Sequence, residues 1–251
     1  MRATAYVLEY HLVSYRRVWR GSALSSFLLP LLTVLGFGLG VGAYVDGVDG
    51  VPYLDWLVPG LIASTAMQVG IGEATWPVLG GFEWRRTYFG HAAAPLRISD
   101  ILDGHLAFVV FRVLTTVSAF LLVAAAFGAL HSWWSLAVLP IVALVGLAVA
   151  APTFAYSATI RSEGYLSILM RLGMLPMSLF SGVFFPIDQM PDVLVGLAYA
   201  LPLWHGVELA RLATLGLAPQ LPVAAHLLVL AAWIGGGWVL ARHRFRRRLV
   251  V

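Results

Sequence analysis

The side chains that most often carry out enzyme chemistry are few in this chain and widely spread. It has no cysteine, which excludes disulfides, thiolate metal sites and cysteine nucleophiles. The seven histidines show no HExxH-like spacing, so they do not predict a zinc site. No GxxxxGK[ST] phosphate loop is present, so the chain is not expected to cradle a nucleotide by that route. We therefore expect a protein that is not an enzyme and binds no metal.

Glu73 is an acidic residue inside an otherwise apolar run, "QVGIGEATWPVLGG". Charged groups at such positions usually face a polar cavity or a partner segment, because exposing them to hydrocarbon is costly. Alternatively, Glu73 lies close enough to the end of its segment to reach water or Arg85. Both interpretations stay open from the sequence.

The segment 82–105, "FEWRRTYFGHAAAPLRISDILDGH", places charged residues beside turn-forming ones. It starts with the charges of Glu83 to Arg86, turns at Pro95-Leu96 and predicts a helix from about Ser99-Asp100, residues suited to an N-cap. A compact charged knob of this kind suits docking into a cleft of a soluble partner. An ordinary connecting loop is the alternative.

The stretch 180–215 raises a question of topology, because "FSGVFFPIDQMPDVL" leads into a second hydrophobic piece, "LPLWHGVELARLATLG". As a membrane span, this piece would bury Glu208 and Arg211 at roughly 2.5–3.5 kcal/mol each, offset in part if they pair on one helix face. Pro202 would also interrupt its helix. A re-entrant hairpin over 187–215 avoids these costs and is permissible where protein surrounds the broken backbone.

We expect Pro186 and Pro191 to end the preceding span, and two short helices, 192–200 and 204–215, to flank a turn at Pro202. The aromatic residues of this region would form either a cap that releases an amphiphile or simple interface anchors; they are Phe184, Phe185, Tyr199 and Trp204. The residues expected in the hairpin and an outer gate are Phe180, Ser181, Gly182, Phe185, Pro186, Pro191, Pro202, Trp204, His205, Glu208 and Arg211.

Composition determines what kind of elements hold these residues. With 60% hydrophobic and 11% charged residues and a mean hydropathy of +0.87, a 251-residue chain has too much apolar surface for a water-soluble core. A helix needs about 20 apolar residues to cross the bilayer. The sequence predicts one all-α polytopic domain over 1–251 with six transmembrane helices, at 22–44, 54–80, 104–130, 133–159, 165–185 and 221–241.

The first residues predict an amphipathic helix over 5–20 that lies in the membrane surface. At 100° per residue, Leu8, Leu12, Tyr15 and Trp19 form one stripe, opposite Glu9, Arg16 and Arg20. The charges and the lack of a small-residue cleavage site exclude a signal peptide. A solvated helix that caps the first span is the alternative.

Arginine placement predicts the orientation of the chain. All cationic side chains are arginines, and all but Arg211 fall in the N-terminal segment, the 81–103 and 160–164 loops, the tail or nearby span ends. The opposite loops carry the acidic residues Asp46, Asp49, Asp55, Asp188, Asp192 and Glu208. By the positive-inside rule both termini are cytoplasmic, which requires an even number of spans. The same rule explains the high pI without invoking nucleic acid.

The order of these elements resembles the membrane subunit, or permease, of type-2 ABC exporters. The resemblance covers essentially the whole chain, and its most specific parts are "LFSGVFFPIDQMPDVL…LPLWHGVELAR" and "APLRISDILDGH". Within that family the chain is similar to the permeases of nodulation lipo-oligosaccharide exporters and related drug exporters.

The resemblance implies an export mechanism driven by ATP. Two permeases, this chain and a second copy or a homologue, would pair in the bacterial inner membrane on two cytoplasmic ABC ATPase subunits that bind ATP and Mg, while this chain binds no cofactor. The 82–103 segment would be the coupling loop that passes ATPase closure to the spans. The residues implied to contact the ATPase are Arg16, Arg17, Glu83, Arg85, Arg86, Pro95, Leu96, Ile98 and Asp100.

Two functions of other classes compete with the exporter. An ion-coupled secondary transporter would place acidic or histidine relays near the middle of its spans, where this chain has mainly Leu, Val, Ala, Gly and Phe. An intramembrane transferase would need a converging set of His, Asp or Ser near one membrane face, whereas these histidines lie in loops of both kinds. The exporter would move a lipid-linked saccharide, a lipid or a drug.

Overall fold

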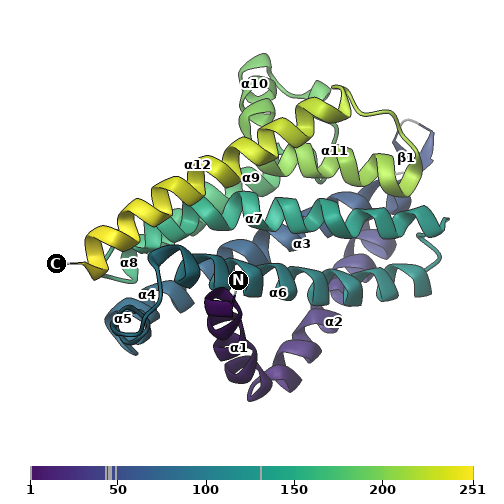
Figure 1. The fold of residues 1–251 in the computed structure, drawn as a ribbon. Coiled ribbons are helices and arrows are strands. Elements are labelled where there is room, and N and C mark those ends of the chain that lie inside the picture. Colours follow the sequence, from purple (N-terminus) through teal and green to yellow (C-terminus); the bar gives the residue numbers. More distant parts are fainter. Residues whose placement is uncertain (1, 43, 45–46, 49, 131, 251) are drawn as a thin grey trace.

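The fold is a bundle of helices in a computed structural model that describes residues 2–42, 44, 47–48, 50–130 and 132–250 (Figure 1). The first half contains α1 (Arg2–Arg16), α2 (Trp19–Leu35), the π-helix η1 (Gly36–Val41), α3 (Tyr53–Ala74), α4 (Trp76–Glu83), α5 (Thr87–Ala93) and α6 (Ile98–Ala126). The second half contains the 3₁₀-helix η2 (Trp133–Ala137), α7 (Val138–Ser157), α8 (Gly164–Leu169), the π-helix η3 (Met170–Met174), α9 (Leu175–Phe180), the 3₁₀-helix η4 (Ile187–Gln189), α10 (Asp192–Ala200), α11 (Pro202–Leu215) and α12 (Val223–Leu249).

The described residues also include a short antiparallel pair of strands, β1 (Gly47–Val48) and β2 (Val51–Pro52), which the all-α prediction did not include. Asp46 and Asp49, used above to predict orientation, lie outside the described residues, as does residue 43 in the first predicted span.

The chain is a polytopic helical membrane protein, as predicted. Four helical stretches in the described part of the chain are long and apolar enough to cross a bilayer: Tyr53–Glu83, Ile98–Ala126, Trp133–Ser157 and Val223–Leu249. Gly164–Phe180 is apolar but shorter, and α2 follows α1 after a bend of 81°. Six spans therefore remain a prediction that these elements can accommodate.

Helix α7 lies at the centre of the bundle, in contact with α3, α6, α11 and α12. Small residues permit these close crossings: a Cβ added to Gly237 of α12 would lie 2.5 Å from the backbone nitrogen of Pro152 in α7. At the α3–α7 crossing, a Cβ on Gly70 would lie 2.6 Å from the carbonyl oxygen of Gly146. Of the "GGG" run at 235–237, only Gly237 serves this packing, since Gly235 and Gly236 face open space.

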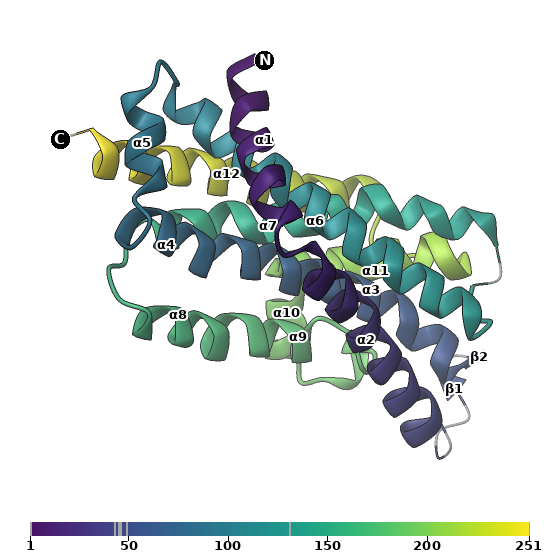
Figure 2. The same cartoon turned by 90° about the horizontal axis from the view of Figure 1, so that it is seen from below.

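The N-terminal helix packs across α6 rather than standing apart, as Figure 2 shows. Val7 is fully buried against Gly104, and Leu8, Leu12 and Tyr15 are partly buried on the same side, so most of the predicted apolar stripe is on the packed face. The helix differs from the one expected over 5–20, and it begins earlier, at Arg2. The helix ends at Arg16, and Trp19 begins α2, where it is 49% exposed.

The fifth apolar run ends its helix five residues earlier than predicted, at Phe180 rather than at 185. Gly182 adopts φ +72, a left-handed conformation in which a helix cannot continue and which glycine alone adopts without strain. Pro186 and Pro191 therefore do not end the fifth span, as was expected. They are instead the residues immediately before η4 and α10. Helices α10 and α11 follow with a bend of 83° between them.

Candidate functional site

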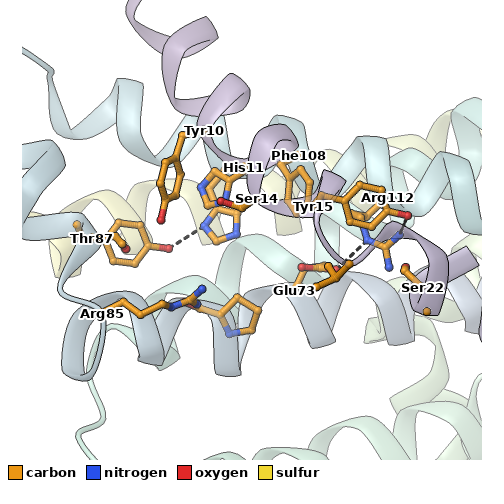
Figure 3. A pocket seen from close by; sticks show the side chains of 15 residues that line it. Tyr10, His11, Ser14, Tyr15, Ser22, Glu73, Arg85, Thr87, Phe108 and Arg112 are labelled. Atoms are coloured by element: carbon orange, nitrogen blue, oxygen red, sulfur yellow. Dashed lines mark hydrogen bonds and ion pairs between the residues drawn. The ribbon is translucent and has the colours of Figure 1, made fainter.

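A hollow with both polar and apolar side chains in its wall lies between α1 and the bundle. This α1 cavity has a volume of about 590 Å³ and is shown in Figure 3. Its wall comes from six helices: Tyr10, His11, Ser14 and Tyr15 of α1, Gly21 and Ser22 of α2, Glu73 of α3, Pro77 of α4, Thr87 and Tyr88 of α5, and His105, Phe108 and Arg112 of α6, with Val18 and Arg85 from the connections.

One end of the α1 cavity is closed by an ion pair between two long helices. Arg112 Nε donates to Glu73 Oε1 at 3.0 Å, and its Nη1 donates to the hydroxyl of Tyr15 at 2.9 Å. The guanidinium also lies over the Tyr15 ring, 4.6 Å from its centroid (Figure 3). Glu73 thus faces a polar cavity and a partner helix, as one interpretation expected, and its partner is Arg112 rather than Arg85.

A second hollow, the α2 cavity, continues from the same arginine. It has a volume of about 260 Å³, and Arg112 lines both cavities. Its wall is rich in hydroxyl and amide side chains although it lies between apolar helices, and it includes Ser26, Thr33, Ser64, Thr65, Gln68 and Thr116. Phe184, which packs on Phe37 with ring centroids 5.3 Å apart, also lines it. The two cavities lie along α2, α3 and α6, and the side chain of Arg112 is part of both walls.

The opposite end of the α1 cavity contains aromatic and histidine rings. His105 is 1% exposed, and its Nδ1 lies 2.7 Å from the Tyr88 hydroxyl. His11 stacks on His105 with centroids 3.9 Å apart. The Nε2 atoms of His11 and His105 are buried and have no hydrogen-bond partner among the described residues. The site therefore holds buried polar nitrogens that nothing in the described chain satisfies.

The predicted ATPase-contacting residues separate into exposed and internal groups. Five of them are exposed, in two places: Arg16 and Arg17 at the α1–α2 bend, and Arg85, Arg86 and Pro95 on either side of α5. Leu96 and Ile98 are partly buried against the core. The α6 helix begins at Ile98, so the N-cap is Arg97 rather than Ser99 or Asp100, and the Asp100 carboxylate accepts the Arg97 backbone N–H at 2.9 Å.

Glu83 has an internal partner that the sequence did not indicate. Its carboxylate pairs with Arg248, whose guanidinium also lies 4.3 Å from the centroid of the Phe82 ring. The same arginine donates to the backbone oxygens of Ala158 and Ile160, at 3.0 and 2.8 Å. Arg248 thereby satisfies carbonyls beyond the last turn of α7, where a cation is favoured. The ends of α4, α7 and α12 are joined at one side chain.

The hairpin region is held by buried polar contacts. Arg211 is 7% exposed; its Nη2 donates to the Gly182 oxygen at 2.6 Å, and its guanidinium lies 3.8 Å from the centroid of the Trp56 ring. Its Nη1 lies 3.6 Å from Glu208 Oε1, which is the pairing on one helix face that the spacing predicted. Glu208 Oε2 also accepts the backbone N–H of Gln220 at 2.9 Å.

His205 forms a second buried contact in the same region. Its Nε2 donates to the Tyr199 oxygen at 2.9 Å, and its Nδ1 lies 2.8 Å from Nδ1 of His226 in α12. Because Nδ1 of His205 is then the acceptor, His226 is the donor of that bond. Trp204 is also buried, at 1% exposed, so it is a core residue here and not part of an exposed aromatic cap. Phe185 and Tyr199 remain exposed, at 39% and 40%.

The two flanks of the predicted hairpin come together. Residues 186–188, before α10, and 217–220, after α11, line one cavity of about 190 Å³ with Trp56 near the start of α3. Phe180 is partly buried at the end of α9, and Ser181, Gly182 and Pro202 are buried, whereas Pro186 is partly buried and Pro191 is exposed. Of the predicted gate residues, Pro186, Trp204, Glu208 and Arg211 line this cavity, and Gly182 is hydrogen-bonded to Arg211.

Sequence reasoning missed Arg112, Tyr88, His11 and Arg248 as site residues. Arg112 had a detectable signal, because an arginine inside an apolar run calls for an opposite charge in a neighbouring helix, and Glu73 is such a residue. The contact between α1 and α6 carried no such signal. In the described part of the chain, no group of three or more His, Asp or Glu side chains is arranged to hold a metal ion.

Comparisons with known proteins agree with this architecture. The ABC-2 type transporter family matches residues 3–215. The chain is 33% identical to Nodulation protein J of Sinorhizobium fredii over 237 residues, which cover 92% of this chain and 90% of the relative. It is 34% identical to Nodulation protein J of Rhizobium leguminosarum bv. trifolii with the same coverage, and 30% identical to that of Rhizobium meliloti over 95% of this chain and 90% of the relative. The chain is therefore a membrane permease that belongs to the ABC-2 type transporter family.

Proposed function

We propose that this permease exports an amphiphilic or hydrophobic substrate from the cytoplasm or the inner leaflet, powered by a separate pair of ATPase subunits. The observation that carries the proposal is the pair of neighbouring cavities with polar side chains in their walls, the α1 and α2 cavities, which share Arg112. We infer that they join into one route when a substrate passes. Polar side chains between otherwise apolar helices can hydrogen-bond a headgroup as it crosses, whereas placing that headgroup in hydrocarbon is costly. Apolar surface on α2 lies beside this route, with Leu24 and Leu32 66% and 58% exposed.

The exposed arginines support docking of the ATPase on the face that carries α5 and the α1–α2 bend. Arg85 and Arg86 are exposed just before α5, and Arg16 and Arg17 are exposed at the bend. Complementary charge would steer and orient a soluble partner with an acidic surface. A second copy of this chain, or a homologous permease, would complete the exporter in the bacterial inner membrane, with both termini cytoplasmic.

The hairpin would lie on the opposite side and receive the substrate at the end of the route. The cavity shared by residues 186–188 and 217–220 supports a segment that enters and leaves on one side. Phe184 lines the α2 cavity just before this region, and exposed Phe185 and Tyr199 offer apolar contacts for a departing amphiphile. Lipid-linked saccharides, lipids and hydrophobic drugs all have the required amphiphilic character.

The test is ATP-driven transport by the permease reconstituted with its ATPase in liposomes. Fluorescent or radiolabelled members of the three substrate classes are followed across the bilayer with and without ATP. Thr65→Leu places a larger apolar side chain in the α2 cavity wall and is expected to slow transport. Thr115→Leu is the matched control, because Thr115 is exposed on α6 and does not line that cavity. If no class moves in an ATP-dependent way, or if the two variants behave alike, the proposal is wrong.

A further inference from the structure

We propose that the α1 cavity binds the anionic headgroup of an amphiphile. The further step, that the bound amphiphile is then exported, rests on the function proposed above. The first support is charge. The charged side chains that line the cavity are Arg85, Arg112 and Glu73, and Glu73 is already engaged by Arg112. The lining therefore carries a net positive charge of one, which is the contribution of Arg85.

Most of the N–H groups of Arg85 have no acceptor among the described residues. Its one hydrogen bond in the described structure runs from Nη2 to the Pro77 oxygen, at a long 3.4 Å. A guanidinium has five N–H donors in a planar fork that matches phosphate and carboxylate oxygens. Its side chain reaches the cavity wall across from Tyr10 and His11 (Figure 3). An anionic group would satisfy these donors with charge-assisted hydrogen bonds.

The Tyr88–His105 pair supplies a second, independent observation. The tyrosine hydroxyl and a neutral imidazole together carry two donor hydrogens, and the contact between them at 2.7 Å uses one. Whichever group donates, at least one donor of the pair has no acceptor among the described residues. His105 is 1% exposed, so bulk water does not relieve this donor readily. Leaving a buried donor without an acceptor destabilises the fold, and an oxygen-rich ligand would supply that acceptor.

The surroundings indicate that the anion belongs to an amphiphile. The cavity includes Val18 and Gly21, at the bend where α1 meets α2. Apolar side chains next to this bend are exposed, including Val18 at 63%, Trp19 at 49% and Leu24 at 66%. A headgroup in the cavity would leave its acyl chains against this apolar face of α2. A free small anion would gain nothing from that face.

Binding to the permease alone tests the inference without ATP or ATPase. The purified chain is titrated calorimetrically with dihexanoyl phosphatidic acid and, separately, with dihexanoyl phosphatidylcholine, which has the same acyl chains but no net charge. We expect phosphatidic acid to bind about tenfold more tightly, as one charge-assisted hydrogen bond would produce. Equal affinity for the two lipids would overturn the proposal.

Two variants, each with a matched control, locate the site. Arg85→Gln is expected to abolish most of the preference, whereas Arg161→Gln, at an exposed arginine outside the cavity, is expected to retain it. Gly21→Leu should weaken binding by filling the cavity, because a Cβ there meets no neighbour within 4 Å. Gly235→Leu is the control, in similarly open space on α12. If either variant behaves like its control, the lipid binds elsewhere and the assignment fails.

Transport then distinguishes the two sources of an anionic amphiphile. Labelled phosphatidic acid that moves across liposomes with ATP, when the ATPase is present, identifies the bound molecule as a substrate. Phosphatidic acid that binds but does not move identifies the cavity as a site for a resident anionic lipid. Failure of binding overturns this inference alone, whereas absence of ATP-driven movement of every amphiphile overturns the proposed function.

Discussion

Arg248 and Glu83, 165 positions apart in the sequence, form an ion pair that joins the end of α12 to the end of α4. The same guanidinium also donates to three carbonyls, those of Ser157, Ala158 and Ile160. A segment predicted to dock the ATPase is therefore tied to two long helices. Force applied at α4 or α5 would reach α7 and α12 through this contact.

Arg248→Ala should destabilise the fold, because it leaves the Glu83 carboxylate and three carbonyls without this donor. Charge-assisted hydrogen bonds contribute about 1.5–3 kcal/mol, so we expect the apparent Tm in detergent to fall by several degrees. Arg247→Ala is the control, since Arg247 is exposed on the same turn. Equal melting temperatures for the two variants would show that the contact is not stabilising.

Gly237→Ala should disrupt the crossing of α7 and α12. The added Cβ would lie 2.5 Å from Pro152 N, a backbone atom that cannot rotate away, and overpacking of this kind costs roughly 1–3 kcal/mol. Gly235→Ala and Gly236→Ala meet open space and should be neutral or slightly stabilising through helix propensity. Thermal unfolding of the three purified variants measures the difference, and a stable Gly237→Ala protein would contradict the packing described.

His11 should make stability depend on pH. Burial, with smaller contributions from His91 and Arg85, lowers the pKa of His11 to about 4 from its ordinary value of 6.5. The unfolded chain then binds the proton first, so the contribution of neutral His11 is complete above about pH 6.5 and is lost as the pH falls toward 4. The loss has an upper bound of about 3 kcal/mol from the size of the shift.

The measurement for His11 compares unfolding of wild type and His11→Phe between pH 7 and pH 4. Phenylalanine keeps a ring to stack against His105 and Phe108 but cannot be protonated. The prediction concerns the difference between the two proteins: the variant should lose less stability on acidification. Parallel curves for the two proteins would rule out a buried neutral His11.

Cysteine labelling tests the hairpin, and the natural absence of cysteine simplifies it. Single cysteines at Asp188 and Ala218, exposed residues on either flank, should both react with an impermeant thiol reagent in intact cells. A cysteine at Arg86 should be protected until the membrane is opened. If Asp188 and Ala218 react from opposite sides, the segment between them crosses the membrane and the hairpin is wrong.

Charge reversal at the exposed arginines tests ATPase docking. Arg17→Glu combined with Arg86→Glu should weaken assembly with the ATPase and uncouple hydrolysis from transport, because both side chains are exposed on the proposed docking face. Arg161→Glu serves as the control at an exposed arginine of another loop. Co-purification and ATPase assays in liposomes measure both effects. Normal assembly and transport in the double variant would exclude this surface from coupling.

The sequence predicted well those features that strong local signals specify. Hydropathy located the long helices, and Pro191 and Pro202 bounded α10 at Asp192–Ala200, because proline favours the first turn of a helix and hinders the end of the preceding one. The end of α9 was misplaced because Gly182 sits in an unbroken apolar run, where hydropathy carries no information about φ.

Contacts between segments that are far apart in the sequence could not be predicted from local sequence patterns. The partner of Glu73 depended on which face of α6 meets α3, and that of Glu83 on where the last turn of α12 ends. Both partners are arginines, and the chain has sixteen of them to choose among. The α1 cavity was missed for the same reason, since its wall requires α1 to lie across α6 and no single segment encodes that arrangement.

The π-helix η3, Met170–Met174, interrupts the run from α8 to α9. A π-helical turn accommodates about one residue more than an α-helical turn over nearly the same length, so such a turn is what a single-residue insertion into a helix produces. Related permeases with one residue fewer here could keep both flanking helices, with an ordinary α-turn between them. A one-residue gap at this point in an alignment would then mark a change of helix winding and not a shift of all the residues that follow.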